Sequence, residues 1–349
     1  MKKKYVKRYL DLSILIGKKS HFLMGPRQTG KSSLIEKQLS TVKRYDLLLK
    51  EDFKNLSFNP SLIREELTNK TKFIVIDEIQ KLPELLDEVH YLIEKKGVHF
   101  LLTGSSARKL KANGVNTLGG RARIQNFFPL TSGELKDQFN LEIMVNHGLL
   151  PSIYFSDDPG ADLESYVALY LQQEVANEGL VRNLPAFSRF MEVAVLCHGE
   201  QIDFSSISND AQVPRTTIHD YFQILKDTLI GHELEVWGKS KKRKPISTPK
   251  FYLFDCGVAK HLMGYKKVEV KSPLFGRAFE SFIFQELIAY SHYCHKAPLK
   301  YWRTKDQKEV DFILDDEIAI EVKGKSTISK NDLEGLLALK DERKMKKYF

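Results

Sequence analysis

The sequence contains little cysteine and no long apolar stretch. Its 349 residues include only three cysteines, Cys197, Cys256 and Cys294, with no short spacing between them. This pattern excludes a disulfide framework and a zinc knuckle, and it predicts a cytoplasmic, reducing location. The longest run without a charged side chain, Ile143–Ser156, has 14 residues and includes Pro151. Such a run is too short for a membrane-spanning helix, so we expect no contact with a membrane.

The composition is otherwise ordinary and predicts a folded chain. Hydrophobic residues make up 42% and charged residues 28%, and the length favours two or three domains. No apolar run follows the basic start MKKKYVKRYLDL, so a secretory signal is not expected. The formal net charge of +9 is concentrated in residues 1–135, which carry 25 basic and 14 acidic side chains. This excess is compatible with nucleic-acid binding and equally with solvated surface lysines.

A phosphate-binding loop is predicted near the N-terminus. The segment GPRQTGKS matches G-x-x-x-x-G-K-[ST] and lies between the short apolar run His21–Met24 and a helical pattern. Glycines allow backbone N–H groups to point inward, and the helix N-terminus adds further donors for phosphate. Lys31 is expected to reach the β- and γ-phosphates, and Ser32 to ligate Mg²⁺. The predicted nucleotide-binding residues are Gly25, Pro26, Arg27, Gln28, Thr29, Gly30, Lys31, Ser32 and Ser33.

An acidic pair follows a second buried strand. Four apolar residues, Phe73–Ile76, precede Asp77 and Glu78. A continuous apolar run indicates a strand buried on both faces, and the carboxyl ends of parallel strands form the ligand crevice of an open sheet. We therefore expect Asp77 to bind Mg²⁺ through water and Glu78 to orient or deprotonate the attacking water.

Two further side chains are candidates for the same site. A third predicted strand, at 98–106, ends in small polar residues, of which Ser105 is the first choice for contact with the γ-phosphate or the water and Thr103 the second. The alternative role for Ser105 is to cap the next helix. Arg121 follows a Gly-Gly pair and is a candidate arginine finger, in cis or on a neighbouring subunit of a homo-oligomer. Its alternative is an ordinary surface arginine.

The middle of the chain is predicted to be helical. Apolar residues spaced by three and four between 160 and 196 favour helices, and 204–230 resembles a helix-turn-helix. Strand-like runs at 232–238 and 250–255, joined by a basic loop that contains Lys241–Lys244, would complete a wing. Such a wing predicts contact with double-stranded DNA, and a protein partner is the alternative. The helical spacing between 160 and 196 is carried by Leu163, Val167, Tyr170, Leu171 and Val175.

The last third carries a second set of charged residues. A predicted helix at 276–287 holds Glu280, and predicted strands at 299–304, 309–316 and 317–325 follow. Asp311 lies in the second strand, and period-two alternation would put Glu321 and Lys323 on one face of the third. A helical Glu, an Asp and a Glu-x-Lys are typical of metal-dependent nucleases, in which the acids hold Mg²⁺ or Mn²⁺ and the lysine steadies the nucleophile. The alternative is an exposed, charged sheet edge.

These motifs together resemble the prokaryotic AAA-type ATPases whose C-terminal half is a conserved domain of unknown function. The resemblance runs over nearly the whole chain and is carried by GPRQTGKS, FIVIDEIQ, FLLTGSS, GGRARIQNFFPLTSGEL, PKFYLFDCGVAKHL, GRAFESFIFQEL and EVDFIL with IAIEVKGK. It implies ATP as the nucleotide, a winged-helix segment and a terminal domain similar to PD-(D/E)XK nucleases. Such a domain would usually continue beyond the final KKYF, so either this protein is short or this copy is truncated.

The predicted fold class is α/β. We expect a P-loop AAA-type parallel-sheet domain at 1–135, a helical connector at 136–185, a winged-helix-like segment at 186–265 and a small restriction-endonuclease-like α/β domain at 270–349. The predicted function is Mg²⁺-dependent ATP hydrolysis coupled to a C-terminal half that binds DNA or protein. The alternatives are an ATP-gated, metal-dependent DNA nuclease and a nucleotide-dependent binding switch that does not hydrolyse ATP.

Overall fold

The computed structural model describes residues 5–17, 19–105, 118–168, 181, 183–238, 248–295, 297–342 and 345–349. The chain folds as two compact units. Unit 1 comprises residues 1–128 with 227–229, and unit 2 comprises 129–226 with 230–349. Among the described residues, no helix is both long and apolar enough to cross a membrane.

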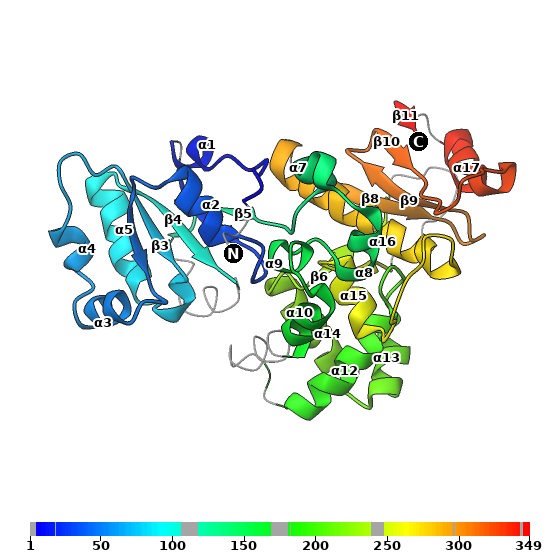
Figure 1. Cartoon of the computed structure of the whole chain (residues 1–349), viewed down its shortest axis with the longest axis horizontal. Coiled ribbons are helices and arrows are strands. Elements are labelled where there is room, and N and C mark those ends of the chain that lie inside the picture. The colour runs from blue at the N-terminus through cyan, green and yellow to red at the C-terminus, as the bar shows by residue number, and fades with distance from the viewer. Residues whose placement is uncertain are drawn as a thin grey trace. The chain divides into compact units, whose positions relative to one another are not determined.

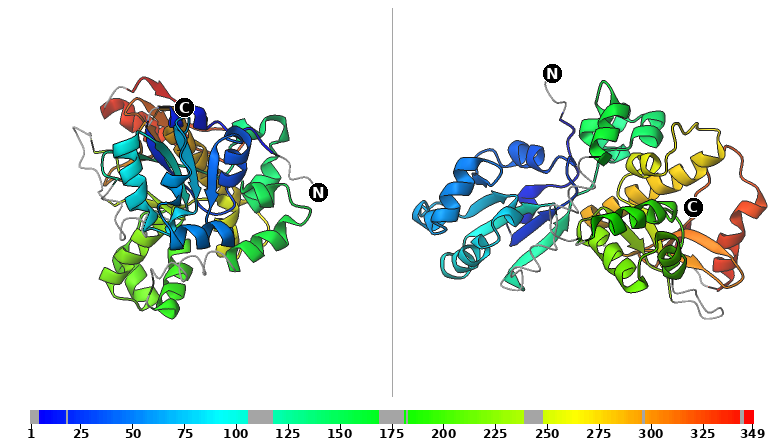
Figure 2. Two further views of the ribbon diagram at one scale, coloured as in Figure 1. Left: turned by 90° about the vertical axis from the view of Figure 1, so that its left-hand side faces the viewer. Right: turned by 90° about the horizontal axis from the view of Figure 1, so that it is seen from below.

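Unit 1 is built on a sheet of five parallel strands in the order β2-β3-β4-β1-β5. Helices lie on both faces of the sheet (Figures 1 and 2). The elements are α1 (Leu12–Ile16), β1 (Ser20–Met24), α2 (Lys31–Gln38), β2 (Lys43–Asp46), α3 (Lys50–Phe58), α4 (Leu62–Glu65), β3 (Phe73–Asp77), α5 (Leu85–Lys96), β4 (His99–Gly104) and β5 (Ala122–Asn126).

The buried strands explain why the sequence pattern was informative here. All five residues of β1 are buried, as are four of the five in β3. Strands covered by helices on both faces have no solvent side, so their sequences are continuously apolar rather than alternating. The predicted strands at 21–24, 73–76 and 98–106 are confirmed with shifts of one or two residues at their ends.

The first part of unit 2 is mainly helical. Ile218, Phe222 and Leu225 of α14 are buried, and Arg215 and Gln223 are exposed, as an amphipathic second helix in the predicted helix-turn-helix requires. Strands β6 and β7 pair antiparallel, and the predicted wing loop with Lys241–Lys244 lies outside the described residues, as do Tyr170, Leu171 and Val175. The elements are α7 (Ser132–Leu135), α8 (Leu141–His147), α9 (Pro151–Tyr154), α10 (Pro159–Tyr166), α12 (Leu184–Leu196), α13 (Phe204–Ala211), α14 (Arg215–Asp227), β6 (Gly231–Leu234), β7 (Lys250–Leu253) and α15 (Cys256–Leu262).

The second part of unit 2 is a small mixed sheet in the order β11-β10-β9-β8. Strands β8, β9 and β10 pair antiparallel, and β11 joins β10 in parallel. The strand predicted at 317–325 is wrong in length: β10 ends at Ile320, because the N–H of Val322 donates to the Asp311 carboxylate, 2.7 Å away, instead of to a strand. The elements are α16 (Pro273–Tyr290), β8 (Leu299–Arg303), β9 (Glu309–Leu314), β10 (Ile318–Ile320), α17 (Glu334–Glu342) and β11 (Lys347–Tyr348).

A buried carboxylate fixes the start of α15 inside unit 2. Asp255 accepts hydrogen bonds from the N–H groups of Gly257 and Val258 at 2.9 and 3.0 Å, and from that of Leu149 at 2.7 Å. Burial raises the pKa of Asp255 to about 6, although these three donors act to lower it. Gly148 has φ of +79°, and a methyl group added there would lie 1.9 Å from Asp255 Oδ1.

Replacing Gly148 by alanine is therefore expected to destabilise unit 2 by about 3–5 kcal/mol, since left-handed strain and overpacking combine. Trp237 and Trp302 are the chain's two tryptophans, and both are buried in unit 2, so their fluorescence during urea unfolding reports this unit.

Gly264→Ala is the matched control for that substitution. Gly264 has φ of +75° but nothing within 4 Å of an added methyl group. Strain alone should then cost about 1–2 kcal/mol. Equal losses in the two variants would show that the contact with Asp255 is unimportant.

Candidate functional site

The register of the parallel sheet brings the predicted motifs to one edge. Leu23 of β1 pairs with Thr103 of β4, and Ile76 of β3 pairs with Leu102 of the same strand. The carboxyl ends of β1, β3 and β4 therefore lie level with one another. As a result the loop that starts at Gly25 meets Asp77 and the end of β4, as expected for a doubly wound sheet.

The loop between β1 and α2 has the geometry of a phosphate cradle. A methyl group at Gly25 would lie 2.3 Å from the Phe127 carbonyl oxygen, so only glycine fits there. Gly30 has φ of +96° and begins α2, and the Thr29 hydroxyl donates to the Pro26 carbonyl at 2.9 Å. The loop therefore leads into the N-terminus of α2, where backbone N–H groups favour bound anions. Of the other predicted loop residues, Arg27, Gln28 and Ser33 are exposed.

Lys31 is buried and folded onto its own loop. Its Nζ donates to the carbonyl oxygens of Gly25 at 2.6 Å and Pro26 at 3.0 Å. The two carbonyl oxygens thus accept the hydrogen bonds of the Lys31 ammonium group. A phosphate bound in the cradle would compete with them for the charge.

Asp77 is fully buried and accepts from three elements. Its Oδ1 accepts from the Thr103 hydroxyl of β4, and its Oδ2 accepts from the Ser32 hydroxyl at 3.2 Å and from Arg44 Nη2 at 2.6 Å. Ser32 and Asp77 were predicted to share a metal and are brought together. Arg44, on the neighbouring strand β2, was not predicted, because nothing in the local sequence KRYD indicates that β2 lies beside β3.

Glu78 is held by a second residue that the sequence did not indicate. Its backbone is left-handed, with φ of +59°, and its N–H donates to the Thr103 hydroxyl at 3.1 Å. The Gln80 amide donates to the Glu78 carboxylate and to the Ser105 hydroxyl, the latter at 3.3 Å. Ser105 thus reaches the site through Gln80, whereas Thr103, the second choice, touches both Asp77 and Glu78.

A buried arginine from the N-terminal segment supports the loop from below. Arg8 donates to the carbonyl oxygens of Thr29 at 2.8 Å and Phe128 at 2.7 Å, and its guanidinium lies 4.1 Å from the centre of the Phe127 ring. Arg8 therefore joins the phosphate loop to the end of β5. The basic N-terminus gave no signal of this role.

Arg121 lies away from the phosphate loop of its own chain. It precedes β5, and the pairing of Ser20 with Ala122 places it at the amino end of the strands. The loop lies at the opposite end, four strand residues farther, or roughly 13 Å. Arg121 pairs instead with Glu94 of α5. This position gives no support to an arginine finger in cis, and a role on a neighbouring copy stays a prediction.

The second set of predicted residues also comes together, around a lysine that was not predicted. Glu280 of α16 and Glu309 of β9 both contact Lys250 Nζ of β7, at 3.2 and 2.6 Å. Lys323 Nζ lies 2.5 Å from Glu321. We call Glu280, Glu309, Asp311 and Glu321 the acidic centre. Among the described residues, no group of three or more His, Cys, Asp or Glu side chains is arranged to hold a metal ion, so the expected second Mg²⁺ or Mn²⁺ is not supported.

The charges of the acidic centre shift one another's pKa values. Burial, with Glu280 and Glu321 nearby, raises the pKa of Asp311 to about 7. Burial opposes the charged form of Lys250, but Glu280 and Glu309 outweigh it and raise the lysine's pKa. Lys250 therefore stays protonated at neutral pH.

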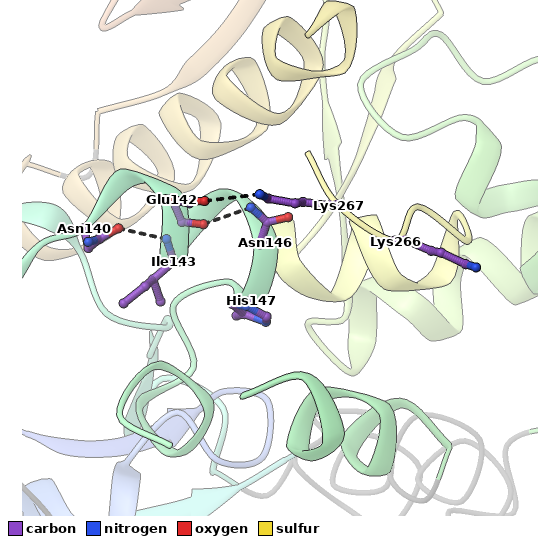
Figure 3. Close-up of a pocket in the computed structure, with 7 residues that line it drawn as sticks. All are labelled: Asn140, Glu142, Ile143, Asn146, His147, Lys266 and Lys267. Carbon is purple, nitrogen blue, oxygen red and sulfur yellow. Dashed lines mark hydrogen bonds and ion pairs between the residues drawn. The ribbon is translucent and has the colours of Figure 1, made fainter. Parts of the chain in front are cut away.

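A separate hollow of about 410 Å³ lies in unit 2 beside α8 (Figure 3). Its polar groups already serve the fold: Asn146 exchanges hydrogen bonds with the backbone of Val268, and Lys267 lies 3.7 Å from Glu142. Burial lowers the pKa of His147, and Lys260 nearby lowers it further. The hollow is lined by Asn140, Glu142, Ile143, Asn146, His147, Lys266 and Lys267.

Comparison with protein families agrees with the geometry of the loop and the sheet. Residues 17–136 match an AAA domain. The AAA domain contains all five parallel strands of unit 1. It is followed by two domains of unknown function, DUF8612 at 138–269 and DUF4143 at 275–348.

Relatives that cover most of the chain include uncharacterized proteins of two bacteria. An uncharacterized protein of Mycobacterium tuberculosis is 25% identical over 84% of this chain and 67% of its own length. An uncharacterized protein of Haemophilus influenzae is 21% identical over 92% of this chain and 86% of its own length. A Walker-type ATPase of Pyrococcus abyssi has a similar solved structure, with a TM-score of 0.50 and 16% identity over 72% of this chain and 93% of that one. This likeness supports the fold of the AAA domain and its neighbours, and no more.

The raised pKa of Asp311 predicts a pH dependence for unit 2. Between the ordinary pKa of 3.8 and about 7, the unfolded state releases this proton while the folded state keeps it, so stability falls as pH rises through that window. We expect wild type to lose roughly 2 kcal/mol more than Asp311→Asn between pH 5 and pH 8, measured by urea unfolding with tryptophan fluorescence.

The control for this prediction is Asp306→Asn, which changes an exposed aspartate in the turn between β8 and β9. It should follow wild type at both pH values. If Asp311→Asn also follows wild type, the proton on Asp311 does not contribute.

Proposed function

We propose that the AAA domain binds ATP with Mg²⁺ and hydrolyses it slowly. The observation that carries this proposal is the meeting of the phosphate loop with Asp77 and Glu78 at one edge of the parallel sheet. The loop backbone and Lys31 would hold the phosphates, and Ser32 with Asp77 would hold Mg²⁺. A hydroxyl and a carboxylate oxygen 3.2 Å apart are suitable donors for this hard cation. The choice of adenine is supported by the match to an AAA domain alone.

In this proposal Glu78 orients a water molecule for attack on the γ-phosphorus. The new bond forms between water oxygen and phosphorus as the bond to the bridging oxygen breaks, and Lys31 balances the charge of the phosphates. Thr103 positions both acids, because it contacts the Asp77 carboxylate and the Glu78 N–H.

Slow turnover is supported by the partners that these residues already have. Lys31 contacts loop carbonyls, Asp77 contacts Arg44, and Glu78 contacts Gln80. Each contact has to be exchanged for nucleotide, metal or water. A switch that binds ATP without hydrolysing it is therefore the second candidate function, supported by the hold of Gln80 on Glu78.

We further propose that the nucleotide state controls binding of DNA or of a protein by unit 2. The exposed side chains of Arg215, His219 and Gln223 on α14 support a partner surface.

We propose a role for Arg121 only as an arginine finger that is supplied to a neighbouring copy in a homo-oligomer. The ATP-gated nuclease is not carried forward, because Lys250 already pairs with two carboxylates of the acidic centre.

Glu78→Gln is expected to lower phosphate release from Mg²⁺-ATP by about 10²-fold or more while ATP binding is retained, since the amide cannot accept the proton of the attacking water. The assay is steady-state phosphate release, with and without duplex DNA. Glu84→Gln, at an exposed position, should leave the rate unchanged. Binding of ATP without turnover in wild type would favour the switch, and no binding at all would refute the nucleotide proposal.

Arg44→Gln is expected to lower, by several-fold, the Mg²⁺ concentration needed for half-maximal ATP binding. The guanidinium lies 2.6 Å from the carboxylate that the metal needs, so the two cations compete. A fluorescent ATP analogue titrated at graded Mg²⁺ measures the effect. Arg64→Gln is the control in the same unit, because its guanidinium lies near Glu88 instead. An unchanged or higher Mg²⁺ requirement in Arg44→Gln would contradict the competition.

A further inference from the structure

The acidic centre contains a cation supplied by the chain itself. Lys250 enters from β7, its side chain is only 4% exposed, and its Nζ lies between Glu280 and Glu309. A buried ammonium group is costly unless charges of opposite sign surround it. The position is therefore one where the fold requires a positive charge.

We propose that Lys250 is the resident cation of the acidic centre, taking the place of a divalent metal and excluding one. The same contact joins the region of DUF8612, which contains Lys250, to the region of DUF4143, which contains Glu280 and Glu309. The inference concerns unit 2 alone and does not depend on nucleotide binding.

The carboxylates of the centre already have donors from the protein. Glu280 accepts from the Tyr252 hydroxyl at 2.6 Å in addition to Lys250. Glu309 accepts from Arg303 Nη1 at 2.9 Å. A divalent cation needs several oxygen ligands whose lone pairs face one point. Hydrogen bonds from tyrosine and arginine occupy lone pairs that such an arrangement would need.

The other two acids are also committed. Asp311 Oδ2 accepts from the Val322 N–H at 2.7 Å, and Glu321 Oε1 lies 2.5 Å from Lys323 Nζ. Within the described part of the chain, Glu321 Oε2 is a buried oxygen without a hydrogen-bond partner. One such oxygen is too few for a metal site, and Lys250 is the cation that contacts two carboxylates of the centre at once.

The position of Lys250 also explains why two matched regions fold as one unit. The hairpin of β6 and β7 continues toward the C-terminal sheet, where the Trp237 N–H donates to the Tyr301 carbonyl at 2.6 Å. The Tyr301 hydroxyl donates to the Thr248 carbonyl. Lys250 of β7 adds an ion pair with Glu280 of α16. The two ion pairs of Lys250 therefore join β7 to α16 and to β9.

The test compares wild type, Asp311→Asn, Lys250→Met and Lys250→Met/Asp311→Asn, without nucleotide. Methionine has an unbranched side chain of similar length to lysine and removes the charge. Thermal unfolding followed by tryptophan fluorescence reports unit 2, in EDTA and in millimolar Mn²⁺, and the electron paramagnetic resonance signal of free Mn²⁺ reports binding. Lys340→Met, at an exposed position of α17, is the matched control.

We expect wild type to show the same midpoint with EDTA and with Mn²⁺, and no uptake of Mn²⁺. Lys250→Met should unfold about 10 °C lower in EDTA, because an uncompensated buried charge remains. Mn²⁺ should recover roughly half of this shift, and the double variant should show no recovery.

Two results would overturn the proposal. One is Mn²⁺ uptake by wild type with a rise in midpoint that Asp311→Asn removes, since the centre would then accept metal beside Lys250. The other is a folded Lys250→Met that keeps the wild-type midpoint or takes up no Mn²⁺. If Lys250→Met does not fold, the wild-type measurement alone decides, since absence of uptake supports the exclusion of metal and uptake refutes it.

Discussion

A carboxylate removed from water has to be matched by donors or cations, and this constraint shapes both units. Asp77 takes a hydroxyl from β4, a hydroxyl from α2 and a guanidinium from β2. Asp255 takes three backbone N–H groups. The acidic centre takes lysines and an arginine. Several of these donors come from segments far apart in sequence, such as Arg44 for Asp77, Leu149 for Asp255 and Lys250 for Glu309, so satisfying one buried charge also fixes how those segments pack.

The two charged sites differ in how readily their cations can leave. The Arg44 side chain is 23% exposed at the edge of the sheet and can exchange its partner for a solvated ion. The Lys250 side chain is 4% exposed and has no comparable route to water. One site is therefore suited to a ligand that comes and goes. The other is suited to permanent cohesion between elements.

Local patterns predicted the phosphate loop and the buried strands because each depends on neighbouring residues. The conformations of GPRQTGKS and of the apolar run before Asp77 follow from their own residues. The observed β1, α2 and β3 lie where these segments predict them. Arg44 and Lys250 were missed because their roles depend on which strands are neighbours, and no local spacing encodes that order. The position of Arg121 was missed for the same reason: a flexible Gly-Gly pair suggested mobility, but the register of β5 sets its end of the sheet.

The helix predicted around Glu280 and the strand predicted around Asp311 are both present. The β6–β7 hairpin changes the interpretation of their acidic residues. The sequence pattern left two interpretations, a metal site and an exposed, charged sheet edge. A lysine from the β6–β7 hairpin instead pairs with two of the acids. Glu280 and Asp311 lie on the predicted helix and strand, whereas Glu321 and Lys323 follow the end of β10 at Ile320, in a setting that favours a different role.

The contact of Arg8 with the phosphate loop has a consequence for where this domain begins. The match to an AAA domain starts at residue 17, but the guanidinium that holds the Thr29 carbonyl lies nine residues earlier. A version of the domain that begins at residue 17 would keep every residue of GPRQTGKS but would lack the hydrogen bonds of Arg8 to the Thr29 and Phe128 carbonyls. The residues that support the loop therefore extend beyond the segment that matches the AAA domain.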